Sequence, residues 1–318
     1  MRTIQTYDRF PLSSVKPLEG LLSYREYCLK ATRAALQGEK HRRETSPVSG
    51  KRLEPAGEME GLLYARCPAS GSFFLAVLPS SEAWRQLLCD VSQYRHSPEA
   101  FHSGLAQSRT DNVFVRKLDW IRETLRLQEL SKPLILEAVS GPSPLTHLLK
   151  ESSLCSEVIP VDEMTLSGYS AERVQVALLL ESLDRVDDPE NLLDAIRTNL
   201  MEGGLLFITA LVSSGFDMAV LGLKNLYLYP PDRANCFSLR GLTELLKRKG
   251  FHLLEVSTPG VLDVEIVRSH LKRDPTLSVS EFEREILESD GQTQEAFQEF
   301  LQQRGLSSFA RIVARKTT

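Results

Sequence analysis

The second half of the chain alternates short apolar runs with amphipathic stretches, and this alternation limits the fold more than any other feature of the sequence. Apolar runs that predict strands occupy residues 134–139, 158–162, 174–180, 205–211 and 251–257. Stretches with the helical spacing of apolar residues occupy 145–151, 189–200 and 239–249. Strands and helices that alternate in this way form a parallel sheet with helices on both faces. The sequence therefore predicts a doubly wound α/β fold.

The first part of the chain has a different pattern. Helices are predicted at 19–37, 82–91 and about 113–130. Between residues 44 and 79, short pieces bounded by Pro and Gly predict turns joined by short strands. We therefore expect an N-terminal region of helices and turns over 1–130, followed by an α/β domain over 131–318.

The C-terminal part adds two predicted helices, 279–289 and 293–303, and a last strand, 309–314. Ser278 and Glu281 have the spacing of a capping box, which predicts where the first of these helices begins.

Charge and composition exclude several classes of protein. The net charge of -4 gives no overall attraction to nucleic acid or to anionic lipid. Met1–Phe10 lacks the apolar core of a signal peptide, and the most apolar stretch, 205–212, is too short to cross a bilayer. Five widely spaced cysteines do not indicate a disulfide framework. We expect a cytoplasmic protein that binds neither nucleic acid nor membrane.

Two segments carry the pattern of a nucleotide-type site. Ile135-Leu136-Glu137 precedes positions 139, 141 and 143, which hold Val, Gly and Ser. This stretch resembles motif I of class I S-adenosylmethionine-dependent methyltransferases, in which glycines occupy those three positions. Val158-Ile159-Pro160-Val161-Asp162 resembles the second strand of the family, whose terminal acid holds the ribose of the cofactor. Asp162 lies 21 residues after Gly141, which is a normal distance for this fold.

Four later segments match the same family in order. Residues 176–189 resemble its fourth strand and the turn that follows, and 200–208 resemble its entry into strand five. Residues 230–238 and 249–251 resemble a branch that often carries an N-terminal zinc ribbon. The resemblance covers about residues 45–315. It implies a Rossmann-like methyltransferase sheet, mostly parallel with an antiparallel C-terminal strand, and a small N-terminal helical and ribbon-like extension.

The resemblance also implies the residues of a site for S-adenosylmethionine. The cofactor-binding candidates are Glu137, Val139, Gly141, Ser143, Asp162 and Glu181. Catalytic candidates are Glu181, which follows the strand 174–180, and Tyr229 and Arg233, which lie where the family usually covers its acceptor site.

The chain departs from the family pattern in its cofactor region. Val139 places a branched side chain near the space of the methionine part of the cofactor, and Pro142 and Pro144 remove two N–H donors. Only eleven residues separate Asp162 from Val174, too few for the usual helix and third strand. Arg185 stands where the family usually has histidine, which removes a group that titrates near neutral pH.

The ribbon-like region departs as well. The four positions that would bind zinc hold Ser46, Ser49, Cys67 and Ser70. Because neutral hydroxyls are poor zinc ligands, we expect no metal there. The alternative is that these are unrelated β-turns rich in Ser, Pro and Gly.

Two functional hypotheses follow. One is methyl transfer from S-adenosylmethionine to a small metabolite or sugar-like acceptor, which is consistent with the retained acids Glu137 and Asp162. The alternative is a catalytically silent methyltransferase-fold scaffold that binds a protein partner or a different ligand. The departures in the ribbon-like region, in the motif I loop and in the shortened segment after Asp162 favour this second hypothesis.

Overall fold

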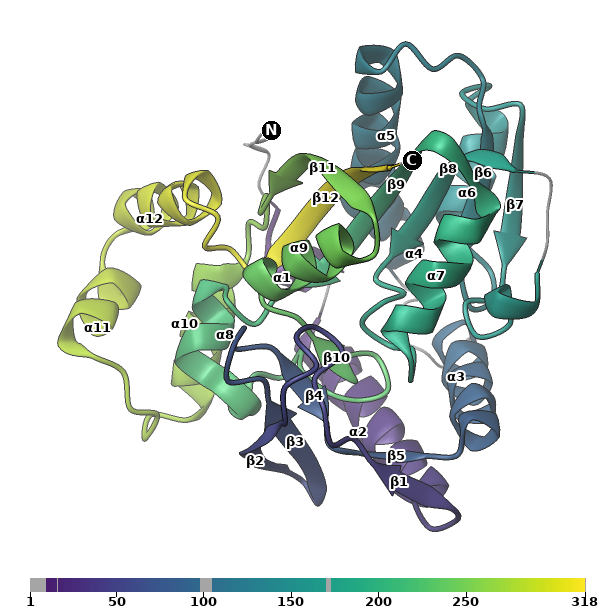
Figure 1. The fold of residues 1–318 in the computed structure, drawn as a ribbon. Helices are drawn as coiled ribbons and strands as arrows, with labels where there is room; N and C mark the ends of the chain where they lie inside the picture. The colour runs from purple at the N-terminus through teal and green to yellow at the C-terminus, as the bar shows by residue number, and fades with distance from the viewer. Residues whose placement is uncertain (1–9, 16, 98–104, 170–172, 318) are drawn as a thin grey trace.

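A six-stranded sheet forms the centre of the protein, and its topology confirms the doubly wound prediction (Figure 1). The computed structural model describes residues 10–15, 17–97, 105–169 and 173–317. The strand order is β11 (Phe251–Ser257), β12 (Phe309–Lys316), β9 (Leu200–Leu211), β8 (Val174–Leu180), β6 (Leu134–Ala138) and β7 (Glu157–Val161). Neighbours among β7, β6, β8 and β9 are parallel, whereas β12 runs antiparallel to both β9 and β11. The sheet is thus mostly parallel with an antiparallel C-terminal strand, as the family resemblance implies.

Helices cover both faces of this sheet. Apolar residues of α7 (Pro189–Asn199) and α9 (Leu239–Arg248) pack on one face. Those of α5 (Val115–Leu127) and α6 (Pro144–Glu151) pack on the other. Because both faces are buried, the strands are apolar along most of their length, which explains the continuous apolar runs in the sequence.

The N-terminal region combines helices with short antiparallel strands. Its helices are α1 (Leu12–Val15), α2 (Leu18–Ala35), α3 (Ser81–Arg95), α4 (Ala106–Arg109) and a π-helical turn, Thr110–Phe114. A two-stranded sheet pairs β1 (Lys40–Arg42) with β5 (Val77–Pro79). A second sheet joins β2 (Glu54–Met59), β3 (Leu62–Arg66), β4 (Phe73–Leu75) and β10 (Asn235–Cys236). Since β10 comes from the second half of the chain, the two halves share this sheet.

The remaining elements surround the carboxyl-terminal edge of the main sheet. They are α8 (Phe216–Leu221), a 3-10 turn at Gly222–Lys224, α10 (Asp263–Arg273), α11 (Glu281–Glu288) and α12 (Gly291–Gln303). The capping-box prediction was wrong by two residues. Ser280 caps α11, because its Oγ accepts from Glu283 N while Glu283 Oε2 accepts from Ser280 N. Ser278 and Ser280 both have Glu three positions later, so the sequence pattern alone does not choose between them.

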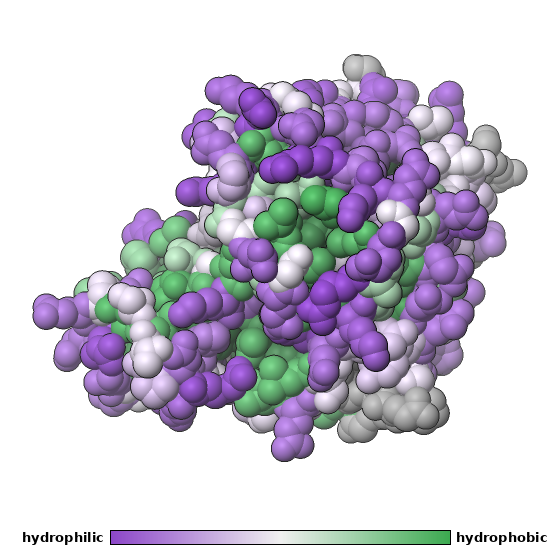
Figure 2. All heavy atoms as spheres, turned by 90° about the horizontal axis from the view of Figure 1, so that it is seen from below, coloured by the Kyte–Doolittle hydropathy of each residue, from purple (hydrophilic) through white to green (hydrophobic). Residues whose placement is uncertain are grey.

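The sequence predicts that the segment between β7 and β8 is too short for the usual helix and third strand, and the structure agrees over its described residues. Its described residues form only a 3-10 turn, Leu166–Gly168, and within the described ranges β7 is an edge strand. Seen from below, the surface is largely hydrophilic, with apolar residues showing in patches toward its middle (Figure 2). In the part of the chain that the structure describes, no helix has the length and apolarity needed to span a membrane.

Candidate functional site

A cavity of about 340 Å³ opens at the carboxyl ends of β6 and β8. Its wall also includes residues from α3, from the segment 109–117, from the loop 259–263 and from β12. Figure 1 shows the parallel strands running toward the side of the molecule where α3 lies. Ligands of doubly wound folds bind at this edge of the sheet. Six of the predicted site residues line the cavity: Glu137, Val139, Ser143, Glu181, Tyr229 and Arg233.

Glu137 ties the loop after β6 to the first turn of α6. Its Oε1 accepts from Ser143 Oγ at 2.7 Å, and its Oε2 accepts from Thr146 Oγ1. Ser143 is the N-cap of α6, since its Oγ also accepts from Thr146 N. Burial raises the pKa of Glu137. The acid of the motif therefore fixes the loop and the start of the helix, while Val139 faces the cavity beside it.

Gly141 does not line the cavity and instead meets α3. Its φ of +83° is a left-handed conformation, and a Cβ there would lie 2.4 Å from Ser92 Oγ. Ser92 Oγ donates to Ser140 O at 2.8 Å. The glycine retained from the motif therefore permits close contact between the loop and a helix of the N-terminal region.

The acid at the end of β7 that faces the cavity is Glu163, not Asp162. Asp162 is exposed, and its Oδ1 accepts from Met164 N at 2.9 Å. Glu163 lines the cavity, and its Oε1 accepts from Ser140 Oγ at 2.9 Å and lies 3.5 Å from Arg185 Nε. Burial raises the pKa of Glu163, although Ser182 lowers it in part. Ser182 Oγ donates to Ala138 O at 2.8 Å, so the buried Oε2 of Glu163 is left without a donor among the described residues.

Sequence reasoning missed Glu163 although it directly follows Asp162. The available signal was a pair of adjacent acids at a strand end. Successive side chains leave a strand in opposite directions, so the position of the last strand residue decides which acid turns inward. That residue is Val161.

Glu181 is held by two cations. Its Oε1 lies 3.2 Å from Lys117 Nζ and its Oε2 lies 2.6 Å from Arg233 Nη2. Arg233 Nη1 also lies 3.2 Å from Asp184 Oδ2. Burial alone lowers the pKa of Arg233, but Asp184 and Glu181 outweigh it, so the net shift is upward. Arg233 is therefore a permanent cation, and no base function is open to it.

Tyr229 completes the aromatic side of the cavity. It is buried, and burial raises the pKa of its hydroxyl well above the usual value. Tyr24 lies edge-on to it, with ring centroids 6.2 Å apart. Tyr229 is thus a neutral wall residue at physiological pH.

The ribbon-like positions also come together, away from the cavity. Ser49 Oγ lies 3.3 Å from Cys67 Sγ, and the hydroxyls of Ser46 and Ser70 face the same thiol. Burial raises the pKa of Cys67, but these hydroxyls lower it more, to about 7. Within the described ranges, no three His, Cys, Asp or Glu side chains are grouped so that they could hold a metal ion.

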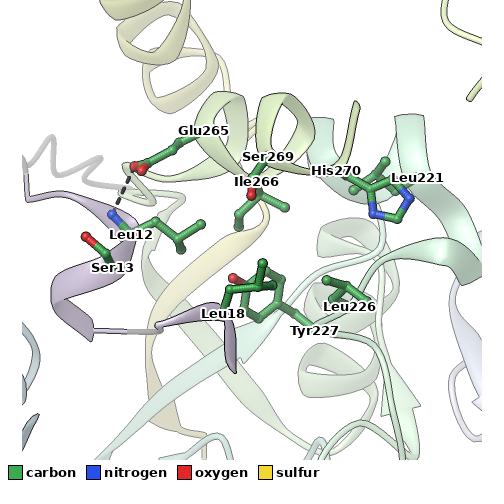
Figure 3. Close-up of a pocket in the computed structure, with 10 residues that line it drawn as sticks. All are labelled: Leu12, Ser13, Leu18, Leu221, Leu226, Tyr227, Glu265, Ile266, Ser269 and His270. Carbon is green, nitrogen blue, oxygen red and sulfur yellow. Dashed lines mark hydrogen bonds between the residues drawn. The ribbon is translucent and has the colours of Figure 1, made fainter. Parts of the chain in front are cut away.

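A second pocket of about 150 Å³ lies between α1 and α10 (Figure 3). Leu12 N donates to Glu265 Oε2 at 3.0 Å across it. Tyr227 lines both this pocket and the larger cavity.

Several solved structures are similar to the chain. One is the 1,6-didemethyltoxoflavin-N1-methyltransferase of Burkholderia thailandensis, solved with bound 1,6-didemethyltoxoflavin and S-adenosylhomocysteine. It is 15% identical with a TM-score of 0.46, and the match covers 83% of this chain and all (100%) of that one. Another is a putative methyltransferase of Bacillus halodurans, 14% identical over 62% of this chain and 99% of that one, with a TM-score of 0.37. The plantazolicin methyltransferase BamL is 12% identical over 75% of this chain and 97% of that one, with a TM-score of 0.41.

No curated protein matches the chain. The family model described as a methyltransferase domain matches residues 90–256, which is just over half of the 318 residues. This match confirms the resemblance to class I S-adenosylmethionine-dependent methyltransferases. The chain therefore belongs to the methyltransferase domain family.

Proposed function

We propose that the protein binds S-adenosylmethionine in the 340 Å³ cavity and transfers its methyl group to a small-molecule acceptor. The observation that carries this proposal is the unsatisfied Oε2 of Glu163. A buried carboxylate oxygen without a donor costs stability unless a ligand supplies one. A ribose hydroxyl is such a donor, and Glu163 lies at the strand end where the family holds its ribose.

The other residues of the cavity fit the same ligand. The cavity volume lies within the range of small-molecule sites, about 300–1,000 Å³. Glu163 would accept from the ribose hydroxyls, and Val139 and Glu181 line the same cavity beside the loop. Lys117, although paired with Glu181, is the cation of this wall that a methionine carboxylate would meet.

The chemistry asks little acid–base work of the protein. When bound, S-adenosylmethionine would supply a methyl group on a sulfonium. The acceptor takes this methyl group by in-line displacement, and S-adenosylhomocysteine is the leaving group. The side chains of the cavity orient the acceptor and exclude water. Arg233 is a cation and Tyr229 stays protonated, so neither acts as a base. These groups favour a small metabolite whose reacting atom is nucleophilic without prior deprotonation, whereas a sugar-like acceptor would need another group to take the proton of its hydroxyl.

One observation favours the silent-scaffold alternative. Glu181 is already bound by Lys117 and Arg233, so these three side chains satisfy one another without a ligand. In that case the cavity would be a structural feature and the protein would act by binding a partner.

Calorimetric titration with S-adenosylhomocysteine separates the two functions, and two neighbouring variants locate the ribose site. We expect Glu163→Gln to weaken binding by about 10- to 100-fold, the effect of losing hydrogen bonds to a charged group. Asp162→Asn, the matched control, should leave the affinity almost unchanged because its side chain is exposed. Absence of binding to the wild type at millimolar ligand would contradict the methyltransferase function. A loss confined to Asp162→Asn would show that Glu163 is not the ribose ligand.

A further inference from the structure

A buried guanidinium without a bonding partner lies in the wall of the cavity. Arg311 stands on β12, opposite Thr209 of β9 and Ser257 of β11. It is 6% exposed and lines the cavity. Its Nε is buried without a hydrogen bond, and among the described residues its guanidinium forms no hydrogen bond or ion pair. The group stacks over the rings of Trp120 and Phe309, 5.4 and 6.0 Å from their centroids.

Four other cations of the same wall are matched by acids, and Arg109 instead donates to Val15 O at 2.9 Å. Lys117 and Arg233 pair with Glu181, Arg95 pairs with Asp232, and Arg185 pairs with Glu163. Burial of a charge without a partner is costly. Arg311 therefore differs from these neighbours because, among the described residues, its guanidinium contacts only two aromatic rings and has neither an acid nor a hydrogen-bond acceptor.

Glu255 on β11 is the acid whose charge acts on Arg311, but it forms its hydrogen bonds with other residues. Its Oε1 accepts from Trp120 Nε1 at 2.9 Å and from Ser257 Oγ at 3.4 Å. Burial lowers the pKa of Arg311 to about 10, and the field of Glu255 only partly opposes this. Arg311 still carries its charge at neutral pH, so the cavity contains a cation that needs an anion.

The surroundings of Arg311 indicate which anion. The planar guanidinium presents a fork of donors that matches the two oxygens of a carboxylate. The same cavity has apolar walls formed by Val113, Phe114, Leu211, Val261 and Phe309. These features fit a ligand with a carboxylate at one end and an apolar body.

The position of Arg311 in the sheet separates it from the cofactor loop. β9 lies between β12 and β8, and both β9 and β8 lie between β12 and β6. With strands about 4.8 Å apart, Arg311 lies about 10 Å from β8 and about 14 Å from β6. The residues proposed for the ribose and the loop are therefore on the other side of the cavity, whereas Lys117, proposed for the methionine carboxylate, is near enough for the charge of Arg311 to lower its pKa.

We infer that Arg311 binds the carboxylate of the methyl acceptor, and that the acceptor is a small organic acid with an apolar body. This inference rests on the proposed methyltransferase function, which it deepens by naming the class of substrate. Arg311 is a binding residue here and takes no part in a proton transfer.

The test uses benzoate and its uncharged isostere benzamide as probes, titrated into the full chain saturated with S-adenosylhomocysteine. We expect the wild type to bind benzoate at millimolar concentration and at least tenfold more tightly than benzamide. Arg311→Gln should lose this preference, whereas Arg311→Lys should retain part of it because the charge remains. Arg315→Gln is the matched control, since Arg315 lies on the same strand but is exposed. It should behave like the wild type.

Each contrary result has a distinct meaning. Equal binding of the two probes, no binding of benzoate, or retention of the preference in Arg311→Gln would overturn the inference. If Arg311→Gln instead loses S-adenosylhomocysteine binding, Arg311 serves the cofactor and the inference is also wrong. Should the wild type bind no S-adenosylhomocysteine, the proposed function fails, and titration of benzoate alone then decides whether Arg311 holds a carboxylate. Thermal unfolding of every variant shows whether Arg311→Gln folds, and Arg311→Lys answers the question if it does not.

Discussion

The knuckle cluster, formed by Ser46, Ser49, Cys67 and Ser70, and the wall of the cavity both depart from the patterns they resemble. At the knuckle cluster, the side chains satisfy one another around a single thiol. In the cavity wall, charged groups are buried with atoms left unbonded, Glu163 Oε2 and Arg311 Nε. A self-satisfied cluster needs no ligand for its stability, whereas buried unpaired charges lower stability and persist where a ligand completes them.

Replacing the three serines of the knuckle cluster with cysteine should give the largest effect, the gain of a zinc site. The two knuckles have the same backbone: Gly50 N donates to Ser46 O and Gly71 N to Cys67 O, both at 2.8 Å. Thiolates around a tetrahedral zinc ion lie about 3.8 Å apart. Because Ser49 Oγ is already 3.3 Å from Cys67 Sγ, a small adjustment suffices. We expect the triple variant with Ser46→Cys, Ser49→Cys and Ser70→Cys to bind one zinc ion, with a favourable binding free energy of about 10 kcal/mol or more.

Zinc content after dialysis, measured with a chromogenic chelator, checks this expectation. The control is the same variant with Cys67→Ser added, which should bind far more weakly. If the three-cysteine variant purifies and refolds without zinc, the four positions are not arranged as in a ribbon. The unrelated-turn interpretation would then hold.

Breaking the Glu181 ion pairs should have the next largest effect. Side-chain exposures of Lys117, Arg233 and Glu181 are only 7%, 14% and 28%. Glu181→Gln leaves Lys117 without its acid, while Arg233 keeps Asp184, so we expect a loss of about 2 kcal/mol in the free energy of unfolding. Urea denaturation at neutral pH measures it.

An exposed pair supplies the matched control for Glu181. Glu123 and Arg126 are 39% and 68% exposed, so Glu123→Gln should cost far less than Glu181→Gln. Adding Lys117→Met to Glu181→Gln should recover part of the loss, because it removes the unpaired charge. Equal costs for the two Gln variants would mean that the cavity network stabilises the fold no more than a surface pair.

The fold was predictable where local pattern and tertiary environment agree. The strands 174–180 and 251–257 have the bounds that their apolar runs predict. β9 begins at Leu200, five residues before the predicted start at 205. Met201–Gly204 have the composition of a turn, and this hid the start of the strand. In the structure they form an irregularity in the register with β8, between the pair of Val174 with Leu200 and the pair of Val176 with Leu205. The division of the chain at residue 130 stays a prediction.

The candidate site was predictable only in part. Glu137, Val139 and Glu181 follow strands, and the ends of parallel strands meet at one edge, so their gathering followed from the sequence. Lys117 and Arg311 come from a helix and from the last strand, and only tertiary packing brings them to the same wall. Nothing in their local sequence distinguishes them from ordinary surface cations.

The smallest expected effect compares one glycine from each region. Gly50 in the knuckles and Gly141 in the loop have positive φ values of +67° and +83°, so alanine strains the backbone at both by about 1–3 kcal/mol. A Cβ at Gly50 meets nothing within 4 Å, whereas at Gly141 it meets Ser92 Oγ at 2.4 Å. Gly141→Ala must therefore displace Ser92 and break its hydrogen bond to Ser140 O, which costs about 1 kcal/mol more. Denaturation of Gly50→Ala, Gly141→Ala, Ser92→Ala and the double variant measures this difference. In the Ser92→Ala background there is no hydrogen bond to break, so Gly141→Ala should cost only the backbone strain, as at Gly50. If Gly141→Ala costs as much in that background as in the wild type, the hydrogen bond to α3 does not account for the excess.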